Sequence, residues 1–238
     1  MPDMIHLGDL VVQVFRKDIR NIHLSVYPPD GRVVISCPGR HSLENIRAYA
    51  LAKLAWIRKQ QRKLQAQPRE SRREYTDRES HYIWGRRYLL SVATTDSKPR
   101  VEQSPKKIIL HVRPETPEEK REELYEEWMR AKLKSAITSL IAKWEPILSV
   151  KVTGFFVQRM KTKWGSCSPA RGTIRLNTEL AKKPRQCLEY LVVHEMLHLL
   201  EPTHNERFRA LLERYMPRWK ERKKTLNSLP VRHEKWVY

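Results

Sequence analysis

The residues best suited to chemistry in this chain are those of His194-Glu195-x-x-His198, followed six residues later by His204. Histidines four positions apart in a helix project from the same face, so both imidazoles can reach one zinc ion. A glutamate beside the first histidine is placed to take a proton from a zinc-activated water. The pattern therefore predicts a hydrolase with one zinc ion per chain and Glu195 as general base.

A catalytic zinc site usually has three protein ligands and one water, so a third ligand is needed. Pro202 cannot continue a helix, and the turn that it forces can bring His204 back towards the metal. Glu213 and Glu221 are the alternative third ligands. His204 could instead cap the following helix, and the histidine pair could be hydrogen-bonded in the core. Tyr190, one turn before the first histidine, could assist the oxyanion or be a core aromatic residue, and the same two alternatives apply to Tyr215.

The elements that position these residues follow from periodicity and turn signals. Alternating apolar runs predict strands at residues 10–15, 22–26, 33–37, 82–93, 108–112, 150–157 and 173–176. Capping residues and apolar faces predict helices at residues 42–64, 116–144, 184–201 and 205–226, with a break at Pro217. Residues 28–31 form the predicted turn of a β-hairpin, residues 66–80 a linker, and residues 96–104 and 164–167 loops.

Two helix starts have specific signals. Ser42 is expected to cap the first helix. Thr116 is expected to cap the second, with Pro117 at its first position and Glu119 completing a capping box. The buried face of this second helix is expected to consist of Leu124, Trp128, Ala131, Leu133, Ala136, Ile137, Leu140 and Ile141.

Composition limits the class of protein. The 238 residues include 40% hydrophobic and 31% charged residues, as in globular proteins. An apolar run of about 18 residues is lacking, which argues against a membrane span, and the start of the chain does not have the pattern of a signal peptide. Three cysteines, Cys37, Cys167 and Cys187, leave an odd count and indicate a reducing compartment. The expected location is the cytoplasm.

The net charge of +20 is distributed unevenly. Basic residues concentrate at 53–73, 159–171 and 207–224, whereas residues 115–127 are mostly acidic. This charge favours contact with nucleic acid, nucleotide phosphates or acidic protein segments. The alternative is that each cluster is a solvated helix face.

Several segments together resemble one family. They are 163–168 (Lys-Trp-Gly-Ser-Cys-Ser), 172–177 (Gly-x-Ile-x-Leu-Asn), 190–198 (Tyr-Leu-Val-Val-His-Glu-Met-Leu-His), His204 with Phe208, Trp56-Ile57-x-Lys59 and Gly85-Arg86-Arg87-Tyr88. They resemble the YgjP-like metallopeptidase family, a zincin-like group of cytoplasmic prokaryotic proteins, over nearly the whole chain. The resemblance implies an α+β fold in which a β-rich N-terminal region with one long helix, residues 1–113, packs on a zincin-like catalytic domain, residues 114–238.

The resemblance also implies a site. Zinc would bind to His194, His198 and His204, and Glu195 would be catalytic. The strand segments around residues 164–177 would line a cleft in which an extended peptide pairs with a sheet edge. The expected substrate-binding residues are Trp164, Gly165, Ser166, Asn177 and Tyr190.

Two further residues bear on the ligand set and on the family assignment. Cys167 could be a fourth, inhibitory zinc ligand or a small buried loop residue. The histidine spacing equals that of metzincins, but Glu201 stands at the position of their turn glycine, which argues against membership in that group.

The sequence thus leaves three functions open. The leading one is a zinc peptidase that acts on peptides or proteins. The alternative is a nucleotide phosphohydrolase, a nucleoside triphosphate pyrophosphatase that uses the same metal site. The third is a nucleic-acid-binding role through residues 53–73 and the last helix, which can coexist with peptidase activity.

Overall fold

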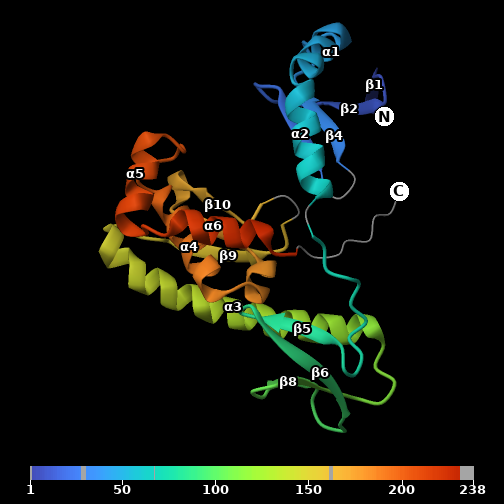
Figure 1. The fold of residues 1–238 in the computed structure, drawn as a ribbon, viewed down its shortest axis with the longest axis vertical. Coiled ribbons are helices and arrows are strands. Elements are labelled where there is room, and N and C mark those ends of the chain that lie inside the picture. Colours follow the sequence, from blue (N-terminus) through green and yellow to red (C-terminus); the bar gives the residue numbers. More distant parts are fainter. Residues whose placement is uncertain (1, 28–30, 67, 161–162, 231–238) are drawn as a thin grey trace. The chain divides into compact units, whose positions relative to one another are not determined.

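The computed structural model describes residues 2–27, 31–66, 68–160 and 163–230 (Figure 1). These residues form the predicted α+β structure, in which three separate sheets combine with helices. The chain divides into two compact units between Arg69 and Glu70. The domain boundary expected after residue 113 would instead cut through a core that strands before this residue share with helices after it.

The first unit is a four-stranded sheet with two helices. Its elements are β1 (Asp3–Leu7), β2 (Leu10–Arg16), β3 (His23–Tyr27), β4 (Arg32–Cys37), α1 (Leu43–Ala52) and α2 (Leu54–Gln65). The strand order is β1-β2-β4-β3, with β2 parallel to β4 and the other pairs antiparallel. Alternate side chains of the strands pack against Ile46, Ala50 and Ile57 of the helices, which gives this unit its own core.

The predictions for this unit are mostly confirmed. The β3–β4 hairpin is present, although the predicted turn at residues 28–30 lies outside the described residues. Ser42 caps α1, because its side chain accepts a hydrogen bond from the backbone N–H of Asn45. Strand β1 was not predicted. The single helix expected at 42–64 is wrong, because Lys53 leaves the helical conformation and divides it into α1 and α2.

A second four-stranded sheet begins the other unit. Its strands are β5 (Ser80–Ile83), β6 (Arg86–Thr94), β7 (Arg100–Gln103) and β8 (Lys107–Val112), in the order β5-β6-β8-β7. The strand expected at 82–93 is divided by a turn in which Trp84 and Gly85 both have positive φ. A Cβ on Gly85 would lie 2.9 Å from the Pro184 ring, so this turn also needs a glycine for close packing. The loop expected at 96–104 contains β7, which corrects that prediction.

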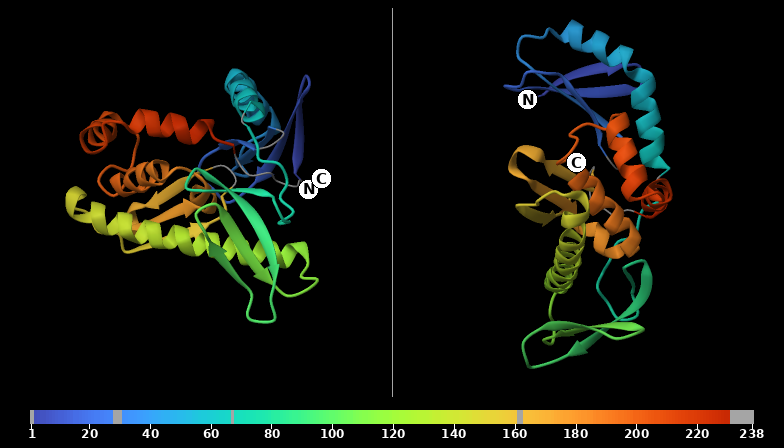
Figure 2. Two further views of the ribbon diagram at one scale, coloured as in Figure 1. Left: turned by 60° about the horizontal axis from the view of Figure 1, so that its bottom comes forward. Right: turned by 90° about the vertical axis from the view of Figure 1, so that its left-hand side faces the viewer.

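Helix α3 (Glu118–Leu148) runs past this sheet and on past the elements that carry the histidine motif (Figures 1 and 2). It buries a continuous stripe of Tyr125, Met129, Leu133, Ile137, Ile141, Trp144 and Leu148. The predicted face is confirmed at Leu133, Ile137 and Ile141. It is wrong at the other five positions, because Leu124, Trp128, Ala136 and Leu140 are only half-buried and Ala131 is exposed. Thr116 does not cap the helix, because its hydroxyl donates to the carbonyl of Arg113 instead.

The remaining elements build the candidate site. They are β9 (Gly154–Gln158), β10 (Gly165–Ser168), the short 3-10 helices η1 (Pro169–Arg171) and η2 (Thr178–Lys182), β11 (Thr173–Asn177), α4 (Arg185–Leu197), α5 (Glu206–Tyr215) and α6 (Trp219–Ser228). The strand order is β10-β11-β9, with β11 antiparallel to β10 and parallel to β9. Strand β10 replaces most of the loop expected at 164–167. The predicted break at Pro217 is confirmed, since it separates α5 from α6.

Helix α4 is central to this unit. It is buried on most of its surface, packs against β10, β11, α3 and α6, and forms part of the main core. The three cysteines are free thiols. None of the helices in the described ranges combines the length and hydrophobicity that a membrane span requires.

Candidate metal centre

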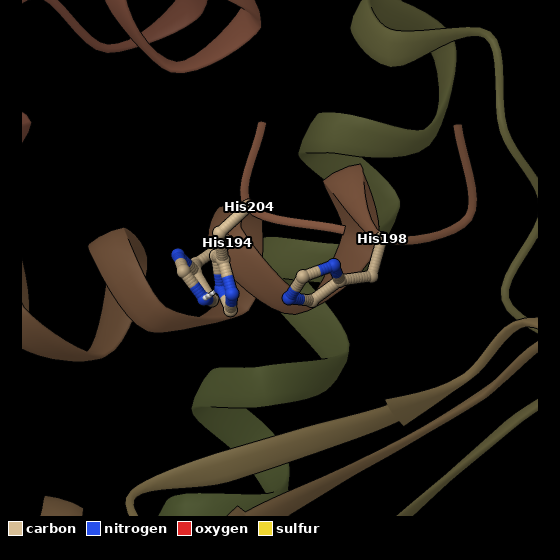
Figure 3. A group of neighbouring side chains, drawn as sticks. All are labelled: His194, His198 and His204. Carbon is tan, nitrogen blue, oxygen red and sulfur yellow. Dashed lines mark hydrogen bonds between the residues drawn. The ribbon is translucent and has the colours of Figure 1, made fainter. Parts of the chain in front are cut away.

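The three predicted histidines lie together at the end of α4 (Figure 3). His194 is on α4, His198 is its C-terminal cap and His204 lies just before α5. One ligand atom from each residue lies within 4.8 Å of the others, and the Nε2 atoms of His194 and His204 are 3.0 Å apart. Zn–N bonds of about 2.0–2.1 Å in a tetrahedron place nitrogens roughly 3.4 Å apart, so this group fits a zinc ion.

The turn predicted at Pro202 brings His204 back to the helix. The backbone N–H of Glu201 donates to the carbonyl of Leu197, and the Glu201 carboxylate accepts from the backbone N–H of Thr203 at 3.2 Å and from its hydroxyl at 2.9 Å. The next residue but one, Asn205, caps α5. The backbone of His204 is therefore fixed by a hydrogen-bonded turn before it and a capped helix after it. These contacts restrict the position of its imidazole.

One imidazole has a defined hydrogen-bond partner away from the site. The His198 Nδ1 atom lies 3.1 Å from the backbone carbonyl oxygen of Glu201. A carbonyl can only accept, so Nδ1 carries the hydrogen, and Nε2 is the nitrogen that the neutral ring offers to a metal. The sequence analysis considered Glu201 as the residue before Pro202 and as a departure from metzincins, and it missed this contact. Its position three residues after His198, at the end of a helix, is the signal that could have identified it.

The Phe208 ring lies against all three imidazoles. It is buried and stacks on His198 at a centroid distance of 4.6 Å, and it meets His194 and His204 edge-on at 5.0 and 4.9 Å. The backbone N–H of Phe208 donates to the Asn205 side chain, which fixes the start of α5. Phe208 therefore supports the three rings from one side.

Substitution of Phe208 by alanine is expected to lower the free energy of unfolding by about 3–5 kcal/mol, since it removes a fully buried ring. We also expect weaker metal binding, because the imidazoles lose the surface that orients them. Urea titration and competition with a chromogenic zinc chelator measure the two effects. Leu226→Ala, at a buried position on α6, provides a control that should lower stability alone. Equal effects of both substitutions on metal affinity would contradict the supporting role.

The environment keeps the imidazoles of His194 and His204 uncharged, as metal ligation requires. Burial lowers the pKa of His194 to about 3, and the neighbouring His198, His204 and Lys223 add to this effect. The pKa of His204 is also lowered, by burial first and then by His198 and Lys223. At neutral pH both rings therefore offer lone pairs.

Glu195 follows His194 on α4 and is buried. It is 4% exposed, and burial raises the pKa of its carboxyl to about 8, although the charge of Lys163 acts in the opposite direction. Strand β10 passes directly beside this carboxyl: a Cβ on Gly165 would lie 2.6 Å from Glu195 Oε1. The space that the glycine leaves is thus occupied by the carboxylate. This accounts for the glycine in the Trp-Gly-Ser-Cys segment.

Gly165→Ala is expected to reduce kcat/KM by about 100-fold, because a displacement of about 1 Å at a reacting group has an effect of this size. The added methyl group would have to displace the Glu195 carboxyl or the strand. Gly154→Ala is the matched control on the same sheet, since its Cβ would meet only a Thr173 methyl at 3.9 Å. A Gly165→Ala enzyme with full activity would show that the carboxyl position is unimportant.

Asn177 supports the loop that leads into β10. It is buried, and its side-chain NH₂ donates to the carbonyls of Met160 at 2.7 Å and Lys163 at 2.9 Å. Its Oδ1 accepts from the backbone N–H of Glu179, and its own N–H donates to the carbonyl of Trp164. We therefore interpret Asn177 as a residue that holds the loop, in place of the substrate contact expected for it.

The two remaining candidates from this segment are half-buried. Trp164 packs on the main core, with the Lys183 ammonium 6.0 Å from its ring centre. Ser166 lies on β10 opposite Arg175 of β11. Both therefore lie next to Gly165, and their contact with substrate stays a prediction.

The two tyrosines differ in position. Tyr190 is buried with its ring centre 5.8 Å from that of His194, and burial, with Glu195 second, raises the pKa of its phenol to about 12. Its hydroxyl is therefore protonated at neutral pH. Tyr215 lies at the end of α5 beneath the Arg214 guanidinium. The structure places only Tyr190 against the histidine group.

The alternative ligands are engaged elsewhere. Glu213 pairs with Lys220, and Glu221 pairs with Arg218 at 2.8 Å. Cys167 is outside the histidine group among the described residues. Burial, followed by the charge of Glu195, raises the pKa of its thiol to about 11, which disfavours the thiolate that zinc binds. Of the third ligands considered, the geometry favours His204.

Convergent imidazoles, with a buried carboxyl at the position after the first of them on a helix that packs on a small sheet, define the class of metal-dependent hydrolases. The family model described as "YgjP-like, metallopeptidase domain" matches residues 20–229 of the chain. The chain belongs to the YgjP-like family and is a metallopeptidase. No match was found among curated proteins.

Two solved structures are similar to part of the chain. Both are metallopeptidase zymogens: abylysin of Pyrococcus abyssi and jannalysin of Methanocaldococcus jannaschii. Abylysin has 23% identity and a TM-score of 0.36 over 38% of this chain and 90% of its own. Jannalysin has 22% identity and a TM-score of 0.34 over 38% of this chain and 92% of its own.

Proposed function

We propose that this metallopeptidase holds one zinc ion with His194, His198 and His204 and hydrolyses peptide bonds with Glu195 as general base. The observation that carries the proposal is a group of three imidazoles whose ligand atoms lie within 4.8 Å of one another, with the buried carboxyl of Glu195 at the next position of α4 after the first of them. The Glu201 carbonyl, which orients His198, and the Phe208 ring support the same assignment.

A bound zinc ion would polarise the scissile carbonyl and make water a better nucleophile at neutral pH. Glu195 then accepts a proton from the attacking water at a carboxylate oxygen and delivers it to the leaving amine. Burial alone favours the protonated carboxyl, and a cation nearby favours the ionised form that a base requires. The β10 backbone beside the carboxyl keeps Glu195 in one position.

The substrate is proposed to be an extended peptide that pairs with β10. This strand is at the edge of its sheet, with β11 on one side, so its other side can bond to an added strand. Gly165 places that edge directly beside Glu195, which would bring the bound main chain to the base. Affinity would then come from main-chain hydrogen bonds, and cleavage preference from side chains that flank the strand.

Zinc-loaded full-length protein incubated with a mixed peptide library, with products identified by mass, tests the proposal. We expect internal cleavage, about one zinc per chain, and loss of cleavage on chelation that zinc restores. The same preparation incubated with nucleoside triphosphates tests the alternative, through release of pyrophosphate. A metal-loaded protein that leaves all peptides intact and hydrolyses nucleotides would overturn the peptidase assignment.

A further inference from the structure

Helix α2 of the first unit presents one strongly basic face. Ile57 is fully buried in the core of this unit. At 100° per residue, Trp56, Lys59, Arg62 and Lys63 fall within roughly one third of the helix circumference, on the side opposite that isoleucine. All four are exposed, and the indole of Trp56 is 43% exposed. A large aromatic ring therefore lies among three cations at the surface.

The charge of this face is not balanced by nearby carboxylates. Arg58, on the flank of the helix, pairs with Asp9, and Gln61 holds the carbonyl of Gly31. Helix α2 contains no acidic residue. In the described ranges, the three cations of the face have no ion-pair partner, so their charges remain available to a ligand.

We propose that this face, formed by Trp56, Lys59, Arg62 and Lys63, binds single-stranded nucleic acid. Cations along a helix neutralise successive phosphates, and Lys59 and Lys63 lie about 6 Å apart along the axis. The exposed Trp56 ring offers a platform on which an unpaired base can stack. Stacking needs an accessible base face, so the site prefers single strands to duplex.

A membrane surface is the other polyanion that a basic helix could meet. A helix that lies in a membrane interface inserts an apolar face into the lipid. The apolar side of α2 is already used, because Ile57 is fully buried and Leu54 packs against the same core. Trp56 alone remains on the basic face, which matches base stacking better than insertion.

Binding of the full-length protein to a fluorescent oligonucleotide of about 20 bases, measured by anisotropy from 20 to 300 mM salt, tests the proposal. The variant Lys59→Gln/Arg62→Gln/Lys63→Gln should bind more than tenfold more weakly at low salt. Its plot of log K against log salt should be shallower by about 2, since each phosphate contact contributes about 0.7 on single strands. Trp56→Ala should weaken binding about tenfold with an unchanged slope, because it removes stacking and no charge.

The matched control is Lys98→Gln/Lys106→Gln/Lys107→Gln, which removes the same charge from exposed positions in two loops of the second four-stranded sheet and at the start of β8. It should leave affinity within about twofold of the unchanged protein, and all variants should keep their peptidase activity. Equal weakening by both triple variants would show a general charge effect and overturn the proposal. Absence of binding at 20 mM salt, or binding to phosphatidylserine vesicles that only the α2 variants lose, would also overturn it.

Discussion

Replacement of Glu195 by glutamine is expected to lower kcat by about 10²- to 10⁴-fold, the range for loss of a general base. Glutamine keeps the shape of the side chain beside Gly165 but cannot accept the proton of the attacking water. The carboxyl is not one of the three proposed ligands, so the metal should stay bound. Since glutamine is uncharged, its burial should not lower stability.

The matched control for this prediction is on the same helix. Glu189 accepts from Lys143 at 2.7 Å and from Arg222 at 2.9 Å, and it has no part in the proposed chemistry. Glu189→Gln should lower the melting temperature and leave kcat close to that of the unchanged enzyme. Single-turnover kinetics with a peptide found in the library assay, together with metal analysis, measure both. A metal-loaded Glu195→Gln enzyme that retains more than a tenth of kcat would exclude Glu195 as the base.

Replacement of His204 by alanine is expected to remove the metal and with it the activity. Two ligands on one helix would remain, and the loss in affinity should exceed the roughly 10- to 100-fold typical of a lost second-shell contact. Because metal binding to the folded state adds to stability, the unchanged protein at 100 times its Kd for zinc gains about 2.7 kcal/mol that the variant lacks.

Zinc titration by calorimetry, combined with thermal unfolding with and without zinc, measures this effect. His6→Ala, at an exposed position on β1, is the control and should bind zinc like the unchanged protein. If His204→Ala bound zinc with unchanged affinity, the third ligand would have to come from another residue, and the proposed ligand set would be wrong.

The histidine group could be predicted because its determinants are local. Two histidines four apart share a helix face, and Pro202 forces the turn that returns His204, so a span of eleven residues contains the signal. The contact between Gly165 and Glu195 could not be predicted in this way. It joins a strand and a helix thirty positions apart in sequence, and the glycine carries no side chain that would indicate its partner.

The same distinction applies to the fold. The hairpin of β3 and β4 and the break between α5 and α6 follow from nearby turn and proline signals. The parallel pairs β2–β4 and β6–β8 depend on which distant strands meet, which periodicity does not specify. Along α3, apolar residues occupy neighbouring stripes, and packing against the rest of the unit selects the stripe through Tyr125 and Met129 over that through Leu124 and Trp128.

The protonated thiol of Cys167 has a practical consequence for inhibitor profiling. Cysteine-alkylating reagents react with the thiolate, and a pKa of about 11 keeps the Cys167 thiol almost entirely protonated at pH 7.5. Cys167, next to the proposed base, should therefore react slowly with iodoacetamide. In an inhibitor profile, we expect chelators to inhibit the enzyme and alkylation of this cysteine to contribute little. Conversely, a covalent inhibitor directed at Cys167 would need a reactive group that modifies a neutral thiol.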